Sequence, residues 1–257
     1  MILRRLAQNL KEQNWTAIVL EFVLLVAGVF FGIQVSNWNE ARHEARQGAE
    51  NLERIRVDLA GDITALERRL VFWKRVSDYG HAAIGYAETG ELVAGSAWQT
   101  LLAFYQASQL FPYVAQDTTY QELRSAGELA LFDSAELRTA LADYYVNGAG
   151  PAANFLFRVE PDYHKLIRGL TPTVASAQVW SKCHESPNAG EQTLLDCESP
   201  TSEADAQAVL DGYSADPRVL PELRFWITNL DVMSELIQTH ESAAHELLER
   251  LRAEASQ

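Results

Sequence analysis

The feature that most constrains this chain is an apolar stretch near the N-terminus, from Trp15 to Trp38. It reads WTAIVLEFVLLVAGVFFGIQVSNW, with no Lys or Arg and a single acid, Glu21. The two tryptophans are 23 positions apart, which is about 34 Å along an α-helix. The hydrocarbon core of a bilayer is about 30 Å thick, and tryptophan prefers its two edges. The sequence therefore predicts one transmembrane helix over residues 15–38, with Trp15 and Trp38 at the membrane interfaces.

Two other interpretations of this stretch are a buried core helix and a cleaved signal peptide. The uninterrupted apolar run covers only residues 22–33, a length that suits either. Against a signal peptide, polar residues follow from Gln34 and there is no small-x-small cleavage site. Against a core helix, the run is apolar on all sides rather than along one stripe. We therefore favour a retained signal-anchor.

Glu21 is the costly residue of the span, because a charge inside a bilayer costs a few kcal/mol. One interpretation places it near the interface, where its side chain can reach water or take up a proton. The other places it on a helix–helix contact face, because Gly28, Gly32 and Ser36 follow on roughly the same side. Small residues at steps of four let two helix backbones approach closely in lipid. The second interpretation predicts a homo-oligomer formed through the transmembrane helix.

Charge separates the two ends of the chain. Residues 1–14 are basic and place their leucines on one helical face, which predicts a short amphipathic helix on the inner membrane surface. The whole chain has a formal net charge of −14, so the part after the tail is strongly acidic. Such a domain repels nucleic acid and anionic lipid. The expected partners are the lipid bilayer, a second copy and an unknown protein, with no nucleic acid.

The orientation of the span follows from weaker signals. The positive-inside rule counts Lys and Arg on each flank, and Arg42, Arg46, Arg54 and Arg56 nearly balance the basic tail. We favour a cytoplasmic N-terminus, because a short basic tail before a first apolar segment is typical of a signal-anchor. This orientation makes residues 39–257 an extracytoplasmic domain.

The two cysteines of the chain, Cys183 and Cys197, lie in a polar segment, residues 171–201, that we expect to be an irregular insertion. A close pair with no other cysteine fits a disulfide in an oxidising compartment. Such a loop contributes about 3 kcal/mol in the chain-entropy model. Two free thiols are the alternative, and a zinc site that includes His184 lacks a fourth ligand. We predict no metal and no cofactor.

Apolar residues at helical spacing predict an all-α fold. Two stripes advance in steps of three and four. The first is Leu52, Ile55, Leu59, Ile63, Leu66, Leu70, Trp73 and Ser77, and the second is Leu223, Trp226, Leu230, Met233, Ile237, His240, Ala244, Leu247 and Leu251. We expect two long helices, at about residues 39–86 and 221–253, to lie antiparallel in a helical bundle.

Shorter helices are predicted between the two long ones. Capping boxes mark four helix starts; they are Ser96–Gln99, Thr118–Gln121, Asp133–Glu136 and Ser202–Asp205. After a turn at residues 148–150, a further helix is expected from Pro151 toward Gly169, kinked at Pro161. No alternating strand pattern is visible in the sequence.

Two short patterns resemble a known family. The span ends in Gln34-Val-Ser-Asn37-Trp38-Asn39-Glu40, a central stretch reads Thr119-Tyr-Gln-Glu-Leu-Arg-Ser-Ala-Gly127, and Leu137 and a Tyr144-Tyr145 pair follow. Together these resemble a family of bacterial single-pass membrane proteins of unknown function. The resemblance implies a bacterial inner-membrane location, with the main domain in the periplasm. It implies no activity, cofactor or catalytic residues.

The sequence contains no recognisable catalytic motif. It has no phosphate-binding Gly-rich loop, no His-Glu-x-x-His and no Gly-x-Ser-x-Gly. His240 lies on an apolar stripe and is expected in the core, while residues 117–120 and Glu122 either line a pocket or cap a helix. We therefore predict a non-enzymatic, membrane-anchored module for protein interaction or self-assembly. The alternatives are a ligand-sensing helical bundle and, third, an unrecognised hydrolase.

Overall fold

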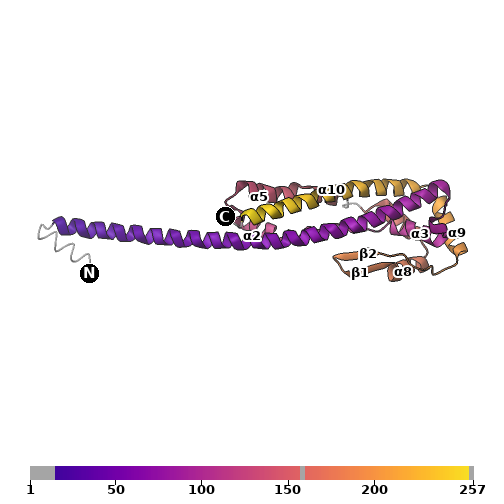
Figure 1. Cartoon of the computed structure of the whole chain (residues 1–257), viewed down its shortest axis with the longest axis horizontal. Coiled ribbons are helices and arrows are strands. Elements are labelled where there is room, and N and C mark those ends of the chain that lie inside the picture. Colours follow the sequence, from indigo (N-terminus) through magenta and orange to yellow (C-terminus); the bar gives the residue numbers. More distant parts are fainter. Residues whose placement is uncertain (1–14, 157–159, 255–257) are drawn as a thin grey trace. The chain divides into compact units, whose positions relative to one another are not determined.

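The computed structural model describes residues 15–156 and 160–254 of the chain, and the predicted basic helix over residues 1–14 lies outside them (Figure 1). The chain divides into two compact units, residues 1–52 and 53–257. The all-α prediction is confirmed, because the described elements are helical apart from one two-stranded hairpin.

The helices are α2 (Trp15–Thr89), α3 (Ala97–Gln106), α4 (Thr118–Ala126), α5 (Ala135–Ala142), α6 (Ala149–Leu156), α7 (Asp162–Leu170), α8 (Thr173–Lys182), α9 (Glu203–Ala215) and α10 (Val219–Glu254). Three short turns connect some of them: η1 (Val93–Gly95), η2 (Glu128–Leu131) and the π-helical turn η3 (Asp143–Asn147). The antiparallel hairpin pairs β1 (His184–Asn188) with β2 (Glu191–Leu194).

The first unit contains the apolar part of α2. This helix is long and apolar enough to cross a membrane, and no residue of its most apolar stretch is buried within the chain. Trp15 and Trp38 are 69% and 65% exposed. At Gly28 and Gly32, an added Cβ would meet no atom within 4 Å. The face predicted for helix–helix contact is therefore open along its glycines.

In the second unit, most of the two predicted stripes is buried, while Leu70 and Ser77 of the α2 stripe are half-buried. Ile55, Leu59, Leu66 and Trp73 on α2 are at most 1% exposed. Every residue of the predicted stripe on α10 is buried as well. Gly90, with φ of 75°, follows the end of α2 in the left-handed conformation that glycine tolerates.

Contacts between α2 and α10 have the order expected for antiparallel helices. Ser77 donates a hydrogen bond to Asp231 over 3.0 Å. Closer to the end of α2, Gly80 lies against the Ile227 side chain. Closer still, Glu88 forms an ion pair with Arg224. Residue numbers rise along α2 as they fall along α10, so the two helices are antiparallel at these three contacts.

Gly80 allows this close approach, so its replacement tests the contact. We expect Gly80→Ala to lower the free energy of unfolding by about 1–2 kcal/mol, because the new methyl group overlaps buried Ile227. Gly85→Ala is the matched control on α2, since nothing lies within 4 Å of its added Cβ. It should stabilise the protein by about 0.4–1 kcal/mol. Chemical denaturation of both variants makes the comparison, and equal effects would contradict the close contact.

The caps of the shorter helices agree with the sequence at two of four places. Ser96 and Ser202 accept hydrogen bonds from the third residue after them, at the starts of α3 and α9. At α5 the cap is Ser134 rather than Asp133, because Ser134 has the extended backbone that an N-cap requires. Thr118 is not a cap, because it is already the first residue of α4.

The segment of residues 171–201 is more regular than predicted. Instead of an irregular insertion, it contains α8 and the β1–β2 hairpin. The strand sequences HESPN and EQTL are polar and carry no alternating apolar pattern, which is why the hairpin was missed. The hairpin turn is fixed locally, because the Gly190 backbone N–H donates to the Asn188 side chain over 2.8 Å.

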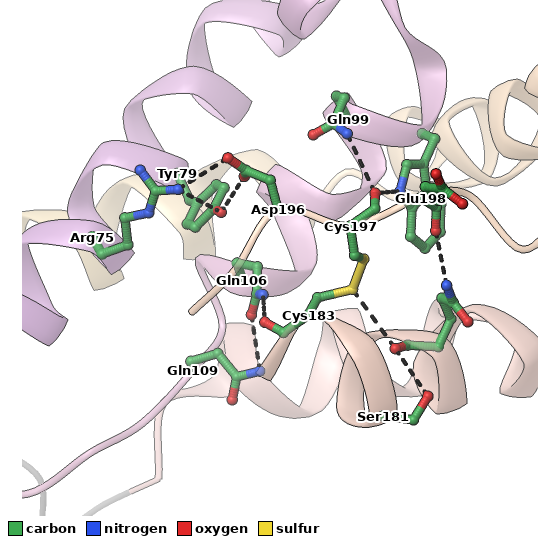
Figure 2. Close-up of a disulfide and its surroundings, with 12 residues drawn as sticks. Arg75, Tyr79, Gln99, Gln106, Gln109, Ser181, Cys183, Asp196, Cys197 and Glu198 are labelled. Atoms are coloured by element: carbon green, nitrogen blue, oxygen red, sulfur yellow. Dashed lines mark hydrogen bonds and ion pairs between the residues drawn. A yellow bond between two sulfur atoms is a disulfide. The ribbon is translucent and has the colours of Figure 1, made fainter. Parts of the chain in front are cut away.

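The predicted Cys183–Cys197 disulfide is confirmed, with a Cα–Cα distance of 5.2 Å (Figure 2). Helix α3 binds the backbone of both cysteines, because Gln106 and Trp98 each donate to one of their carbonyl oxygens over 2.8 Å. Next to Cys197, the Asp196 carboxylate accepts hydrogen bonds from side chains on α2. The disulfide and these bonds tie a polar segment to the helical core.

Candidate functional site

A cluster of polar and aromatic side chains is buried in the second unit. Asp62 comes from α2, Tyr113 from the segment before α4, Tyr144 and Tyr145 from η3, and His240 from α10. Each is at most 8% exposed. A π-helical turn reduces the angle between consecutive side chains, which helps both tyrosines of η3 to face inward. Single π turns of this kind occur frequently at functional sites.

Asp62 is the buried acid of the cluster, with no exposed surface. Its carboxylate accepts hydrogen bonds from the Gln116 backbone N–H at 2.7 Å and from the Tyr144 hydroxyl at 3.2 Å. Burial raises the pKa of Asp62, and these hydrogen bonds oppose the rise. No Lys or Arg of the described residues forms an ion pair with it.

His240 is packed against aromatic rings, as its place on the apolar stripe predicted. Its ring stacks on that of Tyr144, with centroids 4.1 Å apart, and meets the ring of Tyr113 edge-on at 5.7 Å. Burial lowers the pKa of His240 to about 4, so the ring is neutral at pH 7. Its Nδ1 is buried and has no hydrogen-bond partner among the described residues.

Two glycines leave the room that the imidazole of His240 occupies. A Cβ on Gly150 would lie 2.5 Å from the ring Nε2, and a Cβ on Gly148 would lie 3.5 Å from Nδ1. Helix α6 begins at Ala149, within the turn predicted at residues 148–150. Gly148 and Gly150 have a packing role there, because a side chain at Gly150 would displace the ring.

A cleft of about 640 Å³ lies next to this cluster, between α5 and η3 on one side and α10 on the other. Tyr144, Gly148 and His240 belong to both the cluster and the cleft. The charged side chains that line it are Glu136, Asp143, Glu246 and Arg250; Thr139 and Thr239 contribute hydroxyls, and the remaining lining is alanine and Leu247. The volume falls in the range of small-molecule sites.

Sequence reasoning identified only parts of this site. Asp62 was missed because it stands alone between residues of the apolar stripe, with no motif around it. Of residues 117–120 and Glu122, considered either as pocket lining or as helix capping, Tyr120 stacks on Tyr145 at 4.8 Å. Glu122 instead pairs with Arg54. The consecutive tyrosines Tyr144 and Tyr145 before Gly148 were the signal available in the sequence.

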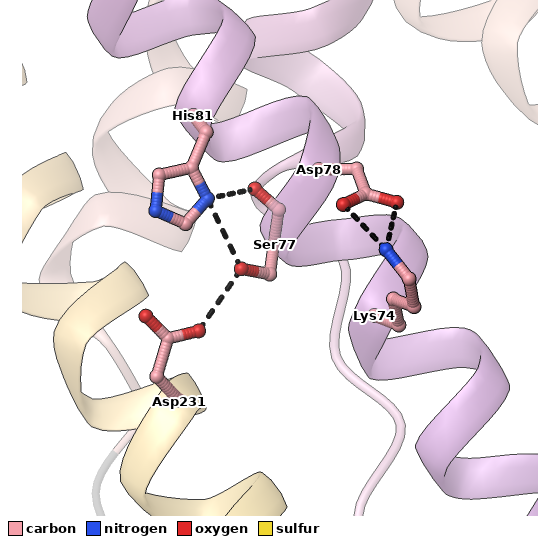
Figure 3. Close-up of polar contacts among 5 residues, drawn as sticks. All are labelled: Lys74, Ser77, Asp78, His81 and Asp231. Atoms are coloured by element: carbon pink, nitrogen blue, oxygen red, sulfur yellow. Dashed lines mark hydrogen bonds and ion pairs between the residues drawn. The ribbon is translucent and has the colours of Figure 1, made fainter.

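A second polar group contains Ser77, His81 and Asp231, the residue types of a hydrolase triad (Figure 3). Its geometry differs from a triad. Ser77 Oγ donates a hydrogen bond to Asp231 at 3.0 Å and lies 3.2 Å from His81 Nδ1, which is also 2.9 Å from the Ser77 carbonyl oxygen. In a triad the acid orients the histidine, which accepts the serine proton. These contacts link Ser77 to His81 one turn further along α2 and to Asp231 on α10. The carboxylate accepts from the serine instead of orienting the histidine, so the group gives no support to a hydrolase.

Of the residues that the sequence singled out, the structure brings the two cysteines together and places the predicted membrane residues in the first unit. Cys183 and Cys197 come together as a disulfide, which excludes the alternatives of free thiols and of a zinc site. Among the described residues, no group of three metal-ligating side chains is present. The predicted membrane residues, Trp15, Glu21, Gly28, Gly32, Ser36 and Trp38, all lie on the part of α2 that belongs to the first unit.

The described residues thus define a helical protein with one apolar N-terminal helix and a disulfide-tied hairpin. No protein-family model matches the chain, and no curated protein or solved structure is significantly similar to it. The resemblance to bacterial single-pass membrane proteins therefore stays a prediction.

Proposed function

We propose that this chain is a single-pass membrane protein whose domain after Trp38 is an exported helical bundle that binds a partner without catalysing a reaction. The observation that carries the proposal is the exposure of the apolar helix, whose most apolar stretch has no buried residue in the chain. A surface of this size requires lipid or another protein to cover it. The disulfide supports export, because disulfides persist in oxidising compartments.

The orientation can be tested with reporter fusions in a bacterial host. A reporter enzyme that is active only after export, fused after Gln257, should give a strong signal in membranes. The physical reason is that the short basic tail stays in the cytoplasm while the acidic domain crosses. A cytoplasm-only reporter at the same position is the matched control and should be silent. The reverse result would place the domain in the cytoplasm and overturn the proposal.

Self-assembly is the first role proposed for the anchor. Gly28 and Gly32 are open on the helix surface, and small residues at this spacing allow close helix contact in lipid. A homo-oligomer formed through Glu21, Gly28, Gly32 and Ser36 is therefore part of the proposal. An inner-membrane and periplasmic location is proposed with it, on the resemblance alone.

Binding of a small ligand is the second candidate function, and one observation favours it. The cleft beside His240 combines apolar lining with converging polar groups, the arrangement expected for a ligand site. The raised pKa of Asp62 and the lowered pKa of His240 occur next to it. Perturbed groups of this kind cluster at functional sites.

A further inference from the structure

The charges around the cleft do not balance. Glu136, Asp143 and Glu246 contribute three carboxylates, and Arg250 contributes one cation. None of these four forms an ion pair with another described residue. Within the described part of the chain, these carboxylates accept only long hydrogen bonds from nearby residues: Asn147 donates to Asp143 at 3.4 Å and Ser134 donates to Glu136 at 3.3 Å. The lining therefore has an excess of negative charge.

One of the residues that line the cleft, His240, has a ring nitrogen without a hydrogen-bond partner in the part of the chain that the structure describes, and this nitrogen lies on the side of Gly148, which also lines the cleft. His240 is 1% exposed, and its Nδ1 has no hydrogen-bond partner among the described residues. The neighbour of Nδ1 is Gly148, which lines the cleft, whereas Nε2 faces Gly150. A buried ring nitrogen without a partner costs free energy. A bound molecule or a water held with it would remove that cost.

We propose that this cleft binds a small organic amine as a cation, attracted by the excess negative charge of Glu136, Asp143 and Glu246, with a short apolar part against the alanines. This inference rests on the ligand-binding candidate above. An anion would meet three carboxylates, and only Arg250 would offset them. A metal ion lacks its ligands, because the described residues contain no group of three metal-ligating side chains. The neutral ring of His240 adds no positive charge that would compete with an amine.

Calorimetry on the full chain in phosphatidylcholine nanodiscs tests the proposal, with empty nanodiscs as the blank. The probe is benzylamine, which is positively charged at pH 7. Benzyl alcohol and benzoate have the same ring with a neutral or a negative group. We expect saturable binding of benzylamine and at least tenfold weaker binding of the other two, because only the amine pairs with the carboxylates.

Two double variants separate the cleft from the general acidity of the chain. Asp143→Asn with Glu246→Gln removes two cleft charges and should weaken benzylamine binding about tenfold or more. Glu67→Gln with Glu235→Gln removes two exposed charges outside the cleft and should leave binding unchanged. Equal weakening by both pairs would show non-specific attraction and overturn the site. Denaturation midpoints of both pairs check that each variant is folded.

The comparison of probes separates this inference from the function on which it rests. Tighter saturable binding of benzoate or benzyl alcohol, lost in the cleft variant, would overturn the amine class and keep a ligand site. No saturable heat with any probe up to about 10 mM would overturn both. Neither result bears on the membrane anchor, which the reporter fusions test by themselves.

Discussion

Leu66→Asp should lower the free energy of unfolding by about 3–5 kcal/mol, because it places an unpaired charge in the core. Leu66 lies in the middle of the buried stripe on α2 and has no exposed surface. A carboxylate there would have to keep its charge without a partner or take up a proton on folding. Urea denaturation of the full chain in detergent, followed by the fluorescence of buried Trp73 and Trp226, measures the loss.

Val71→Asp is the matched control for this prediction. Val71 is on the same helix, five residues further on, and is 73% exposed. The same charge at this position should change the free energy of unfolding by no more than about 0.5 kcal/mol. Arg68→Asp is a poorer control, because Arg68 forms an ion pair with Glu191 of β2. If the Leu66 and Val71 variants lose equal stability, the stripe is not a core face.

His240 should make the protein less stable by about 3 kcal/mol at pH 4 than at pH 7. Burial lowers its pKa from 6.5 to about 4 in the folded protein. Between these values the unfolded chain binds a proton that the folded chain does not, so stability rises with pH across this window. The contribution is fully present above pH 6.5 and is lost as the pH falls toward 4. A difference of about 2.5 pKa units corresponds to about 3 kcal/mol.

The pH dependence of His240 can be separated from that of other groups. Asp62 acts in the opposite direction, because burial raises its pKa and the folded protein gains stability as that carboxylate is protonated. His240→Phe keeps an aromatic ring on Tyr144 and should flatten the dependence between pH 4 and 6.5. A wild-type imidazole that titrates near pH 6.5 by NMR would contradict the prediction directly.

Local patterns were sufficient for much of the helical fold. The steps of three and four from Leu52 to Ser77 predicted the buried face of α2, because helical periodicity depends only on residues of the same helix. Most of the short helices were also found, although two caps are shifted by one residue and α8 was missed in the segment expected to be irregular. At α5, Asp133 and Ser134 are both good cap residues, and their backbone angles decide between them. The hairpin was missed because polar strands tied by a disulfide carry no periodic signal.

The candidate site shows where local patterns end. His240 could be assigned to the core from its stripe, but its stacking on Tyr144 joins residues 96 positions apart. Asp62 joins the same cluster from α2 through Gln116 and Tyr144. Nothing near Asp62 in the chain distinguishes it from the solvated acids of the same helix. Its burial depends on which helix covers that face.

The sequence by itself determined the apolar helix, the two buried stripes and the cysteine pair, because each depends on the kinds of residue and their spacing along one segment. Only the tertiary structure decided that Asp62, Tyr144 and His240 meet, and that a cleft with excess negative charge opens beside them. Burial and the pKa shifts that follow from it arise between segments distant in the chain. They become defined only when those segments pack together.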